Sequence, residues 1–160
     1  TVSSCTFLGG SHITIAASTQ GTIFDATVEN CTVDGGLLTP RGIGISAQSS
    51  TTSTVRLTNN NVTGGTVFGL GITTFGTSVV RALVEGNRVQ GNSALLNQGS
   101  VDASQFCGVF RNNIFDLASI KQFNTSIVQI EDFANFGTVN AGILSTQGTI
   151  TDVPAGTCGF

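Results

Sequence analysis

A six-residue pattern of apolar and polar positions recurs five times along the chain. Apolar residues occupy its first and last places, and a small polar residue or Cys occupies its fourth. The pattern starts at residues 2, 28, 57, 84 and 110, so successive copies lie 26 to 29 residues apart. Because self-similarity at a fixed period of this size is typical of solenoids, the chain is predicted to coil with one repeat per turn.

The alternation of side chains along a strand predicts which places of the pattern face the interior. If each repeat returns above its own start, equivalent residues stack about 4.8 Å apart in parallel, in-register columns. Two of these columns are wholly apolar and are expected to line a continuous core. The first-place column is Val2, Val28, Leu57, Val84 and Phe110, and the last-place column is Phe7, Val33, Val62, Val89 and Phe115.

The fourth-place column is expected to have a structural role and not a catalytic one. It consists of Cys5, Cys31, Asn60, Asn87 and Asn113. Stacked Asn amides can hydrogen-bond along such a column, and Asn tolerates the left-handed backbone of a tight turn. The fourth place is therefore predicted to mark the turn. A disulfide between Cys residues on adjacent rungs would be strained by their parallel Cβ atoms, so Cys5 and Cys31 are expected to be buried, reduced thiols.

Two further strand segments in each repeat complete the circuit. One follows the pattern, at residues 12–15, 42–45, 69–72 and 94–96, and the other precedes it, at residues 22–24, 53–55, 79–80 and 105–107, with 127–130 as its continuation. Gly pairs at 9–10, 35–36 and 64–65, and then Gly91, punctuate the turn after the pattern. The predicted fold is all-β: a single-stranded parallel β-helix of about five to six rungs with roughly 26–29 residues per rung.

The pattern Val-x-Asn-(Asn or Cys)-x-Val followed by Gly-Gly resembles the repeat of right-handed parallel β-helix proteins, the pectate-lyase-like superfamily. The resemblance implies a right-handed coil and covers residues 1–130 well and 131–160 poorly. We therefore expect β-helix rungs over 1–130, and a final irregular rung with a C-terminal cap over 131–160. We also expect a fragment of a longer chain, because the sequence has no Met and its first residues already begin a strand, whereas solenoid ends are normally capped.

Composition and charge narrow the choice of partners and location. The net charge of the 160 residues is −3 and the six basic residues are scattered, which argues against nucleic-acid binding. The apolar runs are too short to span a bilayer. Cys107 and Cys158 are candidates for a disulfide in an oxidising compartment, although the sequence leaves open whether they are bridged. The expected location is extracellular or at the cell surface.

The catalytic and calcium-binding residues of the pectate-lyase-like enzymes are not recognisable in this sequence. The lyases of that superfamily bind calcium through clustered acidic residues, whereas here Glu131 and Asp132 form an isolated pair that is expected to be solvated. With His12 as the one histidine, no metal site is predicted. No cofactor is expected, and calcium belongs only to a lyase alternative. Without Trp or Tyr, the aromatic residues considered for exposure are Phe68, Phe75 and Phe136.

The weak catalytic candidates lie in the outward-facing second-place column: Glu29, Glu85 and Arg111, together with Arg56 one place before the pattern. Glu29 and Glu85 would lie two rungs apart, about 9.6 Å at the standard strand spacing. That is the upper end of the roughly 6.5–9.5 Å between the carboxylates of inverting glycosidases. The other interpretation is a solvated ladder of ion pairs with the two arginines.

Two functions follow from these observations. The leading one is a non-catalytic extracellular or cell-surface β-helix module with a rigid structural, display or adhesion role. The alternative is a polysaccharide-active enzyme, a lyase or glycoside hydrolase or a fragment of one, with its active face on the exposed sheet. The expected partners are a polysaccharide or another protein chain, and self-association through the exposed terminal rung is also expected.

Overall fold

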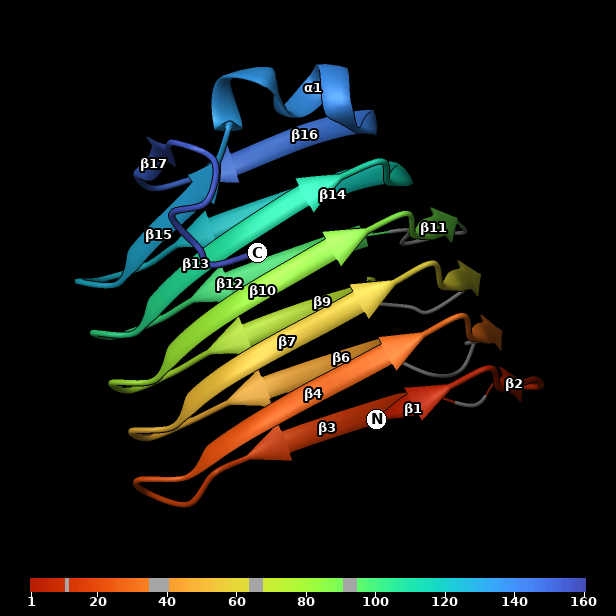
Figure 1. Ribbon diagram of the computed structural model, residues 1–160, viewed down its shortest axis with the longest axis horizontal. Coiled ribbons are helices and arrows are strands. Elements are labelled where there is room, and N and C mark those ends of the chain that lie inside the picture. The colour runs from red at the N-terminus through yellow and green to blue at the C-terminus, as the bar shows by residue number, and fades with distance from the viewer. Residues whose placement is uncertain (11, 35–40, 64–67, 91–94) are drawn as a thin grey trace.

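The computed structural model spans the 160 residues and describes residues 1–10, 12–34, 41–63, 68–90 and 95–160. Most of the described residues form strands, which stack as a parallel β-solenoid of about five turns with little helix (Figure 1). This confirms the predicted fold class. The predicted Gly turns at 35–36, 64–65 and 91 lie outside the described residues.

The first wall of the coil is a seven-stranded parallel sheet, called here the seven-stranded sheet. Its strands follow one another in chain order, one from each rung: β1 (Val2–Ser3), β4 (Ile23–Glu29), β7 (Thr52–Thr58), β10 (Val79–Glu85), β13 (Gln105–Arg111), β15 (Ile127–Glu131) and β17 (Ile150–Val153).

The two other walls belong to one ten-stranded sheet. The short wall contains β2 (Thr6–Phe7), β5 (Thr32–Asp34), β8 (Asn61–Thr63), β11 (Arg88–Gln90) and the start of β14 (Ile114–Gln122). The long wall contains β3 (Ile13–Ala17), β6 (Arg41–Ala47), β9 (Phe68–Thr74), β12 (Leu95–Ser100), the rest of β14 and β16 (Ala141–Gln147). Strand β14 is long enough to join the two walls.

The coil is right-handed. In Figure 1 the nearer strands of the seven-stranded sheet run to the right and the farther strands of the long wall run to the left, while the chain climbs from red to blue. Right-handed crossovers between parallel strands are strongly favoured because strands twist to the right.

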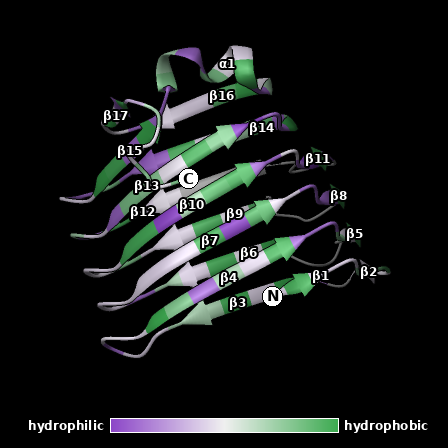
Figure 2. Cartoon of the chain, viewed as in Figure 1, coloured by the Kyte–Doolittle hydropathy of each residue, from purple (hydrophilic) through white to green (hydrophobic). Residues whose placement is uncertain are grey.

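The apolar columns form the core as the sequence predicts. In the first-place column Val2 pairs with Val28, and Leu57 pairs with Val84. Val28, Leu57 and Val84 are fully buried, and so are most residues of the last-place column. Figure 2 shows the resulting alternation of hydrophobic and polar positions along the strands of the seven-stranded sheet.

The position of the turn differs from the prediction. The third place of the pattern adopts the left-handed backbone, with φ of 54° at Asn30, 54° at Asn59 and 66° at Gly86. The fourth place instead points into the coil and stacks. Because the chain bends inside the pattern, its first half merges with the strand that precedes it into one seven-residue strand, and its last residues form the separate short wall.

Residues 131–160 contain two strands and two short helical segments. Strand β16 pairs with β14 and β17 pairs with β15, so both continue existing walls. Between β15 and β16 the chain forms η1 (Phe133–Asn135) and α1 (Phe136–Val139), and Figure 1 shows α1 lying across the C-terminal end of the coil. Phe136, a candidate for an exposed aromatic side chain, is instead buried at 3% exposure, because it packs onto the end of the core.

Candidate functional site

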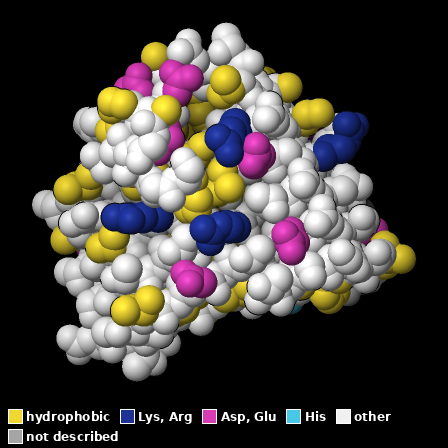
Figure 3. Space-filling model, viewed as in Figure 1, with side chains coloured by type: hydrophobic (Ala, Val, Ile, Leu, Met, Phe, Trp, Pro, Cys, Tyr) yellow, Lys and Arg dark blue, Asp and Glu magenta, His cyan; other side chains and the backbone are white. Residues whose placement is uncertain are grey.

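The charged candidates lie together on the outer face of the seven-stranded sheet. The strand register places the second-place residues in one line across five rungs: Ser3, Glu29, Thr58, Glu85 and Arg111. In Figure 3 this face carries a few acidic and basic side chains, some of them in contact, on a surface that is mostly uncharged. A small hollow of about 110 Å³ lies on this face beside Arg81, Gln105 and Gln129.

The structure brings Glu85 and Arg111 into contact. The Arg111 guanidinium donates to the Glu85 carboxylate through Nε at 2.9 Å and through Nη2 at 3.4 Å. Both side chains are partly exposed, 46% for Arg111 and 32% for Glu85, so the pair contributes little to stability. Glu29 lies two rungs away in the same column, with Thr58 between the two acids.

Arg56 lies in the neighbouring column and faces the C-terminal residue. Its guanidinium carbon is 5.2 Å from the centroid of the Phe160 ring, which is the geometry of a cation–π contact. In its own column Arg56 is next to Thr27 on one side and Leu83 on the other. Of the four catalytic candidates, the structure therefore joins Glu85 to Arg111 and directs Arg56 toward the chain terminus.

A second, smaller core covers part of this outer face. Residues 154–160, called here the C-terminal tail, fold back over the sheet. Cys158 forms a disulfide with Cys107 on β13, with a Cα–Cα distance of 5.3 Å, so the bridge that the sequence left open is present. The cluster beneath and within the tail consists of Val109, Val153 and Cys158, with Leu83, Cys107 and Phe160 packed against them.

Sequence reasoning missed this second core, although a signal for it was present. Leu83 and Val109 stand at outward positions of β10 and β13, where the alternation predicts polar residues. Neighbouring outward apolar residues in one column indicate that something covers them. Val109 is 6% exposed because the tail lies above it.

Glu131 is part of the same contact. It is 9% exposed, and its carboxylate accepts the backbone N–H of Cys158 at 2.6 Å. The expectation that the Glu131–Asp132 pair is solvated was therefore wrong for Glu131. The reason is that Glu131 ends β15 on the outer face, directly under the tail, whereas Asp132 is exposed.

The fourth-place column forms a ladder of amides inside the coil. The side-chain amide of Asn60 donates to Asn87 Oδ1 at 3.0 Å, Asn87 donates to Asn113 Oδ1 at 3.0 Å, and Asn113 donates to Asn140 Oδ1 at 2.8 Å. Each of these four Asn residues is at most 5% exposed. Each also donates to a backbone carbonyl of the preceding rung, as Asn87 does to Leu57.

Asn140 is a member that sequence reasoning missed. It follows Asn113 by 27 residues, which is the period of the repeat. The signal was weak because helix α1 replaces the strand that would begin a sixth pattern. The Asn140 amide also donates to the carbonyl of Phe136 at 3.1 Å, and so it ties the helix to the ladder.

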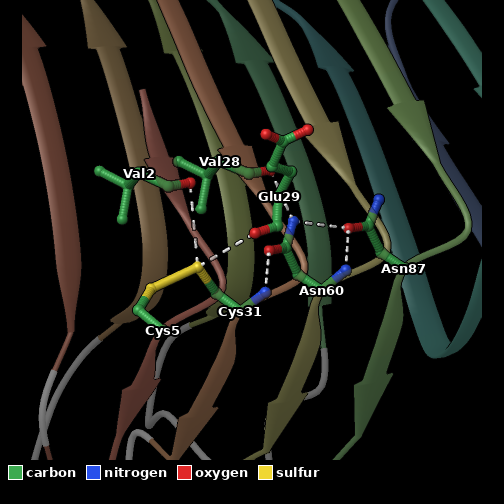
Figure 4. Close-up of a disulfide and its surroundings, with 7 residues drawn as sticks. All are labelled: Val2, Cys5, Val28, Glu29, Cys31, Asn60 and Asn87. Atoms are coloured by element: carbon green, nitrogen blue, oxygen red, sulfur yellow. Dashed lines mark hydrogen bonds between the residues drawn. A yellow bond between two sulfur atoms is a disulfide. The ribbon is translucent and has the colours of Figure 1, made fainter.

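At its N-terminal end the ladder meets a disulfide between Cys5 and Cys31 (Figure 4). The expectation of reduced thiols was wrong, because the two side chains converge at the corner and the Cα–Cα distance of 4.7 Å lies within the usual range for a bridge. The Cys31 sulfur lies 3.4 Å from the carbonyl oxygen of Glu29. Asn87 donates to the equivalent carbonyl of its own rung, that of Glu85.

The acidic residues at the C-terminal end of the coil were also considered as a binding site. A hollow of about 570 Å³ lies beside Asp132 and Asp152, but the Asp152 carboxylate accepts the backbone N–H groups of Phe133 and Ala134 at 2.8 and 3.3 Å. Among the described residues, no three His, Cys, Asp or Glu side chains gather as a metal site would require. In the same part of the chain, no helix has the length and apolar character needed to cross a membrane.

The structure also shows the exposure of the single histidine and of one of the aromatic residues considered for exposure. His12 is exposed, and Phe75 is 36% exposed on the turn after β9. The side chain of Phe68 lies outside the described part of the structure.

Comparison with known proteins adds no relative. No family model, no curated protein and no solved structure matches the chain. The fold and the surface chemistry are therefore the observations on which a functional proposal can rest.

Proposed function

We propose that this chain is a non-catalytic extracellular or cell-surface β-helix module that holds its outer faces in a fixed arrangement, for a structural, display or adhesion role. The observation that carries the proposal is the bonding between rungs. Parallel ladders on three walls, a buried column of Asn amides and the Cys5–Cys31 disulfide all join one rung to the next.

This bonding favours rigidity. Bending the coil between two rungs would break strand hydrogen bonds on all three walls together with a buried amide bond such as that from Asn87 to Asn113. A buried polar group that loses its partner is costly, because no water replaces the bond. A coil of this kind suits a protein that spaces or presents surfaces.

The two disulfides support the proposed location. Cys5–Cys31 and Cys107–Cys158 use all four cysteines of the chain. Such bridges persist in oxidising environments, which include the extracellular space and cell surfaces.

The surface acids support a non-catalytic role. Glu85 is held by Arg111, and Glu131 is buried against the backbone of Cys158. These contacts give both carboxylates a partner within the chain. The exposed polar residues of the seven-stranded sheet offer a surface for an extended polysaccharide or another protein chain.

The test is an assay on a panel of neutral and acidic polysaccharides, with and without calcium, which measures new reducing ends and unsaturated products. We expect neither product. Co-sedimentation with insoluble polysaccharides in the same samples measures adhesion independently of cleavage. Product formation that is lost in both Glu29→Gln and Glu85→Gln, with the fold retained by circular dichroism, would overturn the proposal in favour of the polysaccharide-active enzyme.

A further inference from the structure

The C-terminal tail is attached to the sheet beneath it at few points. Its backbone hydrogen bonds are local turns, from Thr157 to Pro154 at 3.2 Å and from Gly159 to Gly156 at 3.3 Å. Among the described contacts, the hydrogen bond that joins the tail to the sheet is the one from the Cys158 N–H to Glu131. The tail therefore lies on the sheet without adding a strand to it.

Beneath the tail lies a strip of mostly apolar side chains that crosses several rungs and also contains Glu131, the register partner of Val153. Leu83 on β10, Val109 on β13 and Val153 on β17 belong to this strip, and they face away from the main core. Val109 and Val153 are 6% and 9% exposed with the tail in place. Since their own strand positions point outward, removing the tail would expose them to water.

We propose that the C-terminal tail is a strap latched by the Cys107–Cys158 disulfide, and that reduction by a dithiol releases it and uncovers this strip. The covalent bond is the main tie, because the other contacts that the described residues show between the tail and the sheet are weak: one hydrogen bond, the Arg56–Phe160 contact, the approach of Arg81 to Gly159 and the small apolar cluster. Short segments with few buried contacts open at low free-energy cost.

The disulfide is reachable from one side. Cys107 is partly exposed and lines a hollow of about 110 Å³ together with Arg81, Gln105 and Gln129, whereas Cys158 is fully buried. Arg81 is the register neighbour of Cys107, and its positive charge favours the approach of the reductant's thiolate, which is the attacking species in disulfide exchange. Attack at Cys107 is therefore the expected route.

Exchange consumes one dithiol and converts the bridge into two protein thiols. A thiolate of the dithiol attacks Cys107 Sγ, the Cys107–Cys158 bond breaks, and Cys158 leaves as a thiolate that takes up a proton. The tail is free at this step. The second thiol of the reductant then displaces the Cys107 sulfur, which leaves two protein thiols and one oxidised dithiol.

The other disulfide provides an internal control. Cys31 is 1% exposed and lies inside the main core, where strand pairing on both sides and the amide of Asn60 hold its rung independently of the disulfide. Reduction of Cys5–Cys31 should therefore leave Cys31 buried. Cys158 is equally buried before reduction, but it has no such rung to hold it.

The test is reduction of the full chain with dithiothreitol, followed by a time course of alkylation with iodoacetamide and mass spectrometry of each cysteine. We expect Cys158 to react about ten-fold faster than Cys31 or more, close to a thiol in an unfolded peptide. Equal, slow reaction of Cys158 and Cys31 would show that the tail stays docked and would overturn the proposal. A Cys107–Cys158 bond that resists reduction until the chain unfolds would overturn it as well.

Hydrogen exchange over residues 154–160 provides a second measurement that needs no reductant. The double variant Cys107→Ser/Cys158→Ser should exchange about ten-fold faster in this segment than the parent and bind more of a hydrophobic dye, while its strand signal in circular dichroism is unchanged. The matched variant Cys5→Ser/Cys31→Ser should keep the segment protected. Unchanged protection in the first variant, or equal loss in both, would contradict the latch.

Discussion

At the scale of single residues, the Asn amides inside the coil are the side chains on which stability depends most. Each Asn of the ladder satisfies buried donors and acceptors on more than one rung. Asn87, for example, accepts from both the backbone and the side chain of Asn60 and donates to Asn113 and Leu57. Removing one amide therefore leaves several buried groups without partners.

Asn87→Ala is expected to lower the free energy of unfolding by about 3 kcal/mol or more, because the backbone N–H and one side-chain N–H of Asn60 would lose their buried acceptor and the Leu57 carbonyl would lose a buried donor. Urea denaturation followed by circular dichroism measures the change. Asn61→Ala is the matched control, since Asn61 is exposed on the same wall, and it should change stability by less than about 0.5 kcal/mol. Similar losses in both variants would argue against the ladder.

Buried hydroxyls give a prediction of the opposite sign. Ser53 is 2% exposed in an otherwise apolar column, and its hydroxyl has no hydrogen-bond partner among the residues that the structure describes. Ser53→Ala should therefore stabilise the fold by about 1 kcal/mol. Ser104 is also buried, but its hydroxyl contacts Thr74 Oγ1 at 3.1 Å. Ser104→Ala should destabilise by about 1 kcal/mol in the same urea titration. Destabilisation by Ser53→Ala would show that its hydroxyl is bonded.

At the scale of elements, helix α1 closes the C-terminal end of the core. The ring of Phe136 packs against Phe110 at 5.7 Å, Phe115 at 6.0 Å and Phe133 at 6.1 Å between centroids. It thus covers the last residues of both apolar columns. A helix of four residues has little stability of its own, so this packing and the bond from Asn140 hold it in place.

Phe136→Ala is expected to lower the free energy of unfolding by about 3–5 kcal/mol, the usual range for emptying a buried aromatic site. Differential scanning calorimetry should show a lower melting temperature. Phe75→Ala is the control, because Phe75 is partly exposed, and it should cost about 1 kcal/mol or less. A small effect at Phe136 would mean that the helix is not part of the core.

The elements differ in how far the sequence predicts them. The stacking of Val28, Leu57 and Val84 was predictable because apolar residues recur there at one period. The left-handed turn was not, since Asn30 at the third place and Cys31 at the fourth are adjacent, and both places accept small or polar residues. The tail was predictable only in part: Cys107 and Cys158 were candidates for a bridge, but the sequence left that bridge open and it spans 51 residues.

The candidate site likewise contains contacts that the sequence period predicts and contacts that it does not. The column that aligns Glu29, Glu85 and Arg111 follows from the period, and the register places these residues in one line. The contact of Arg56 with Phe160 depends on the fold-back of the tail, for which no periodic signal exists. Regular neighbours could be predicted from spacing, whereas contacts made by the tail required the structure.

At the scale of the whole molecule, the two ends of the coil differ. Helix α1 covers part of the C-terminal end, whereas at the other end β3 pairs only with β6 among the described strands and carries no charged residue. Uncharged edge strands promote pairing between chains, and natural proteins often protect them with a lysine.

The 160-residue chain is therefore expected to self-associate as its concentration rises, and light scattering coupled to size exclusion measures this. Thr14→Lys places a charge on the exposed side of β3 and should reduce the association. Gln105→Lys, at an exposed position in the middle of the seven-stranded sheet, should leave it unchanged. Association that does not respond to Thr14→Lys would place the contact elsewhere.

Stacking of the rungs in register underlies the whole fold, and it fixes the distance between two distant rungs. Ile23 and Ile127 are both exposed and occupy one column, linked through Thr52, Val79 and Gln105. Spin labels at Ile23→Cys and Ile127→Cys should give a narrow distribution in pulsed dipolar spectroscopy, with backbones about 19 Å apart, or four strand spacings. A broad distribution, or a mean well beyond the reach of two labels at that separation, would contradict the stacked coil.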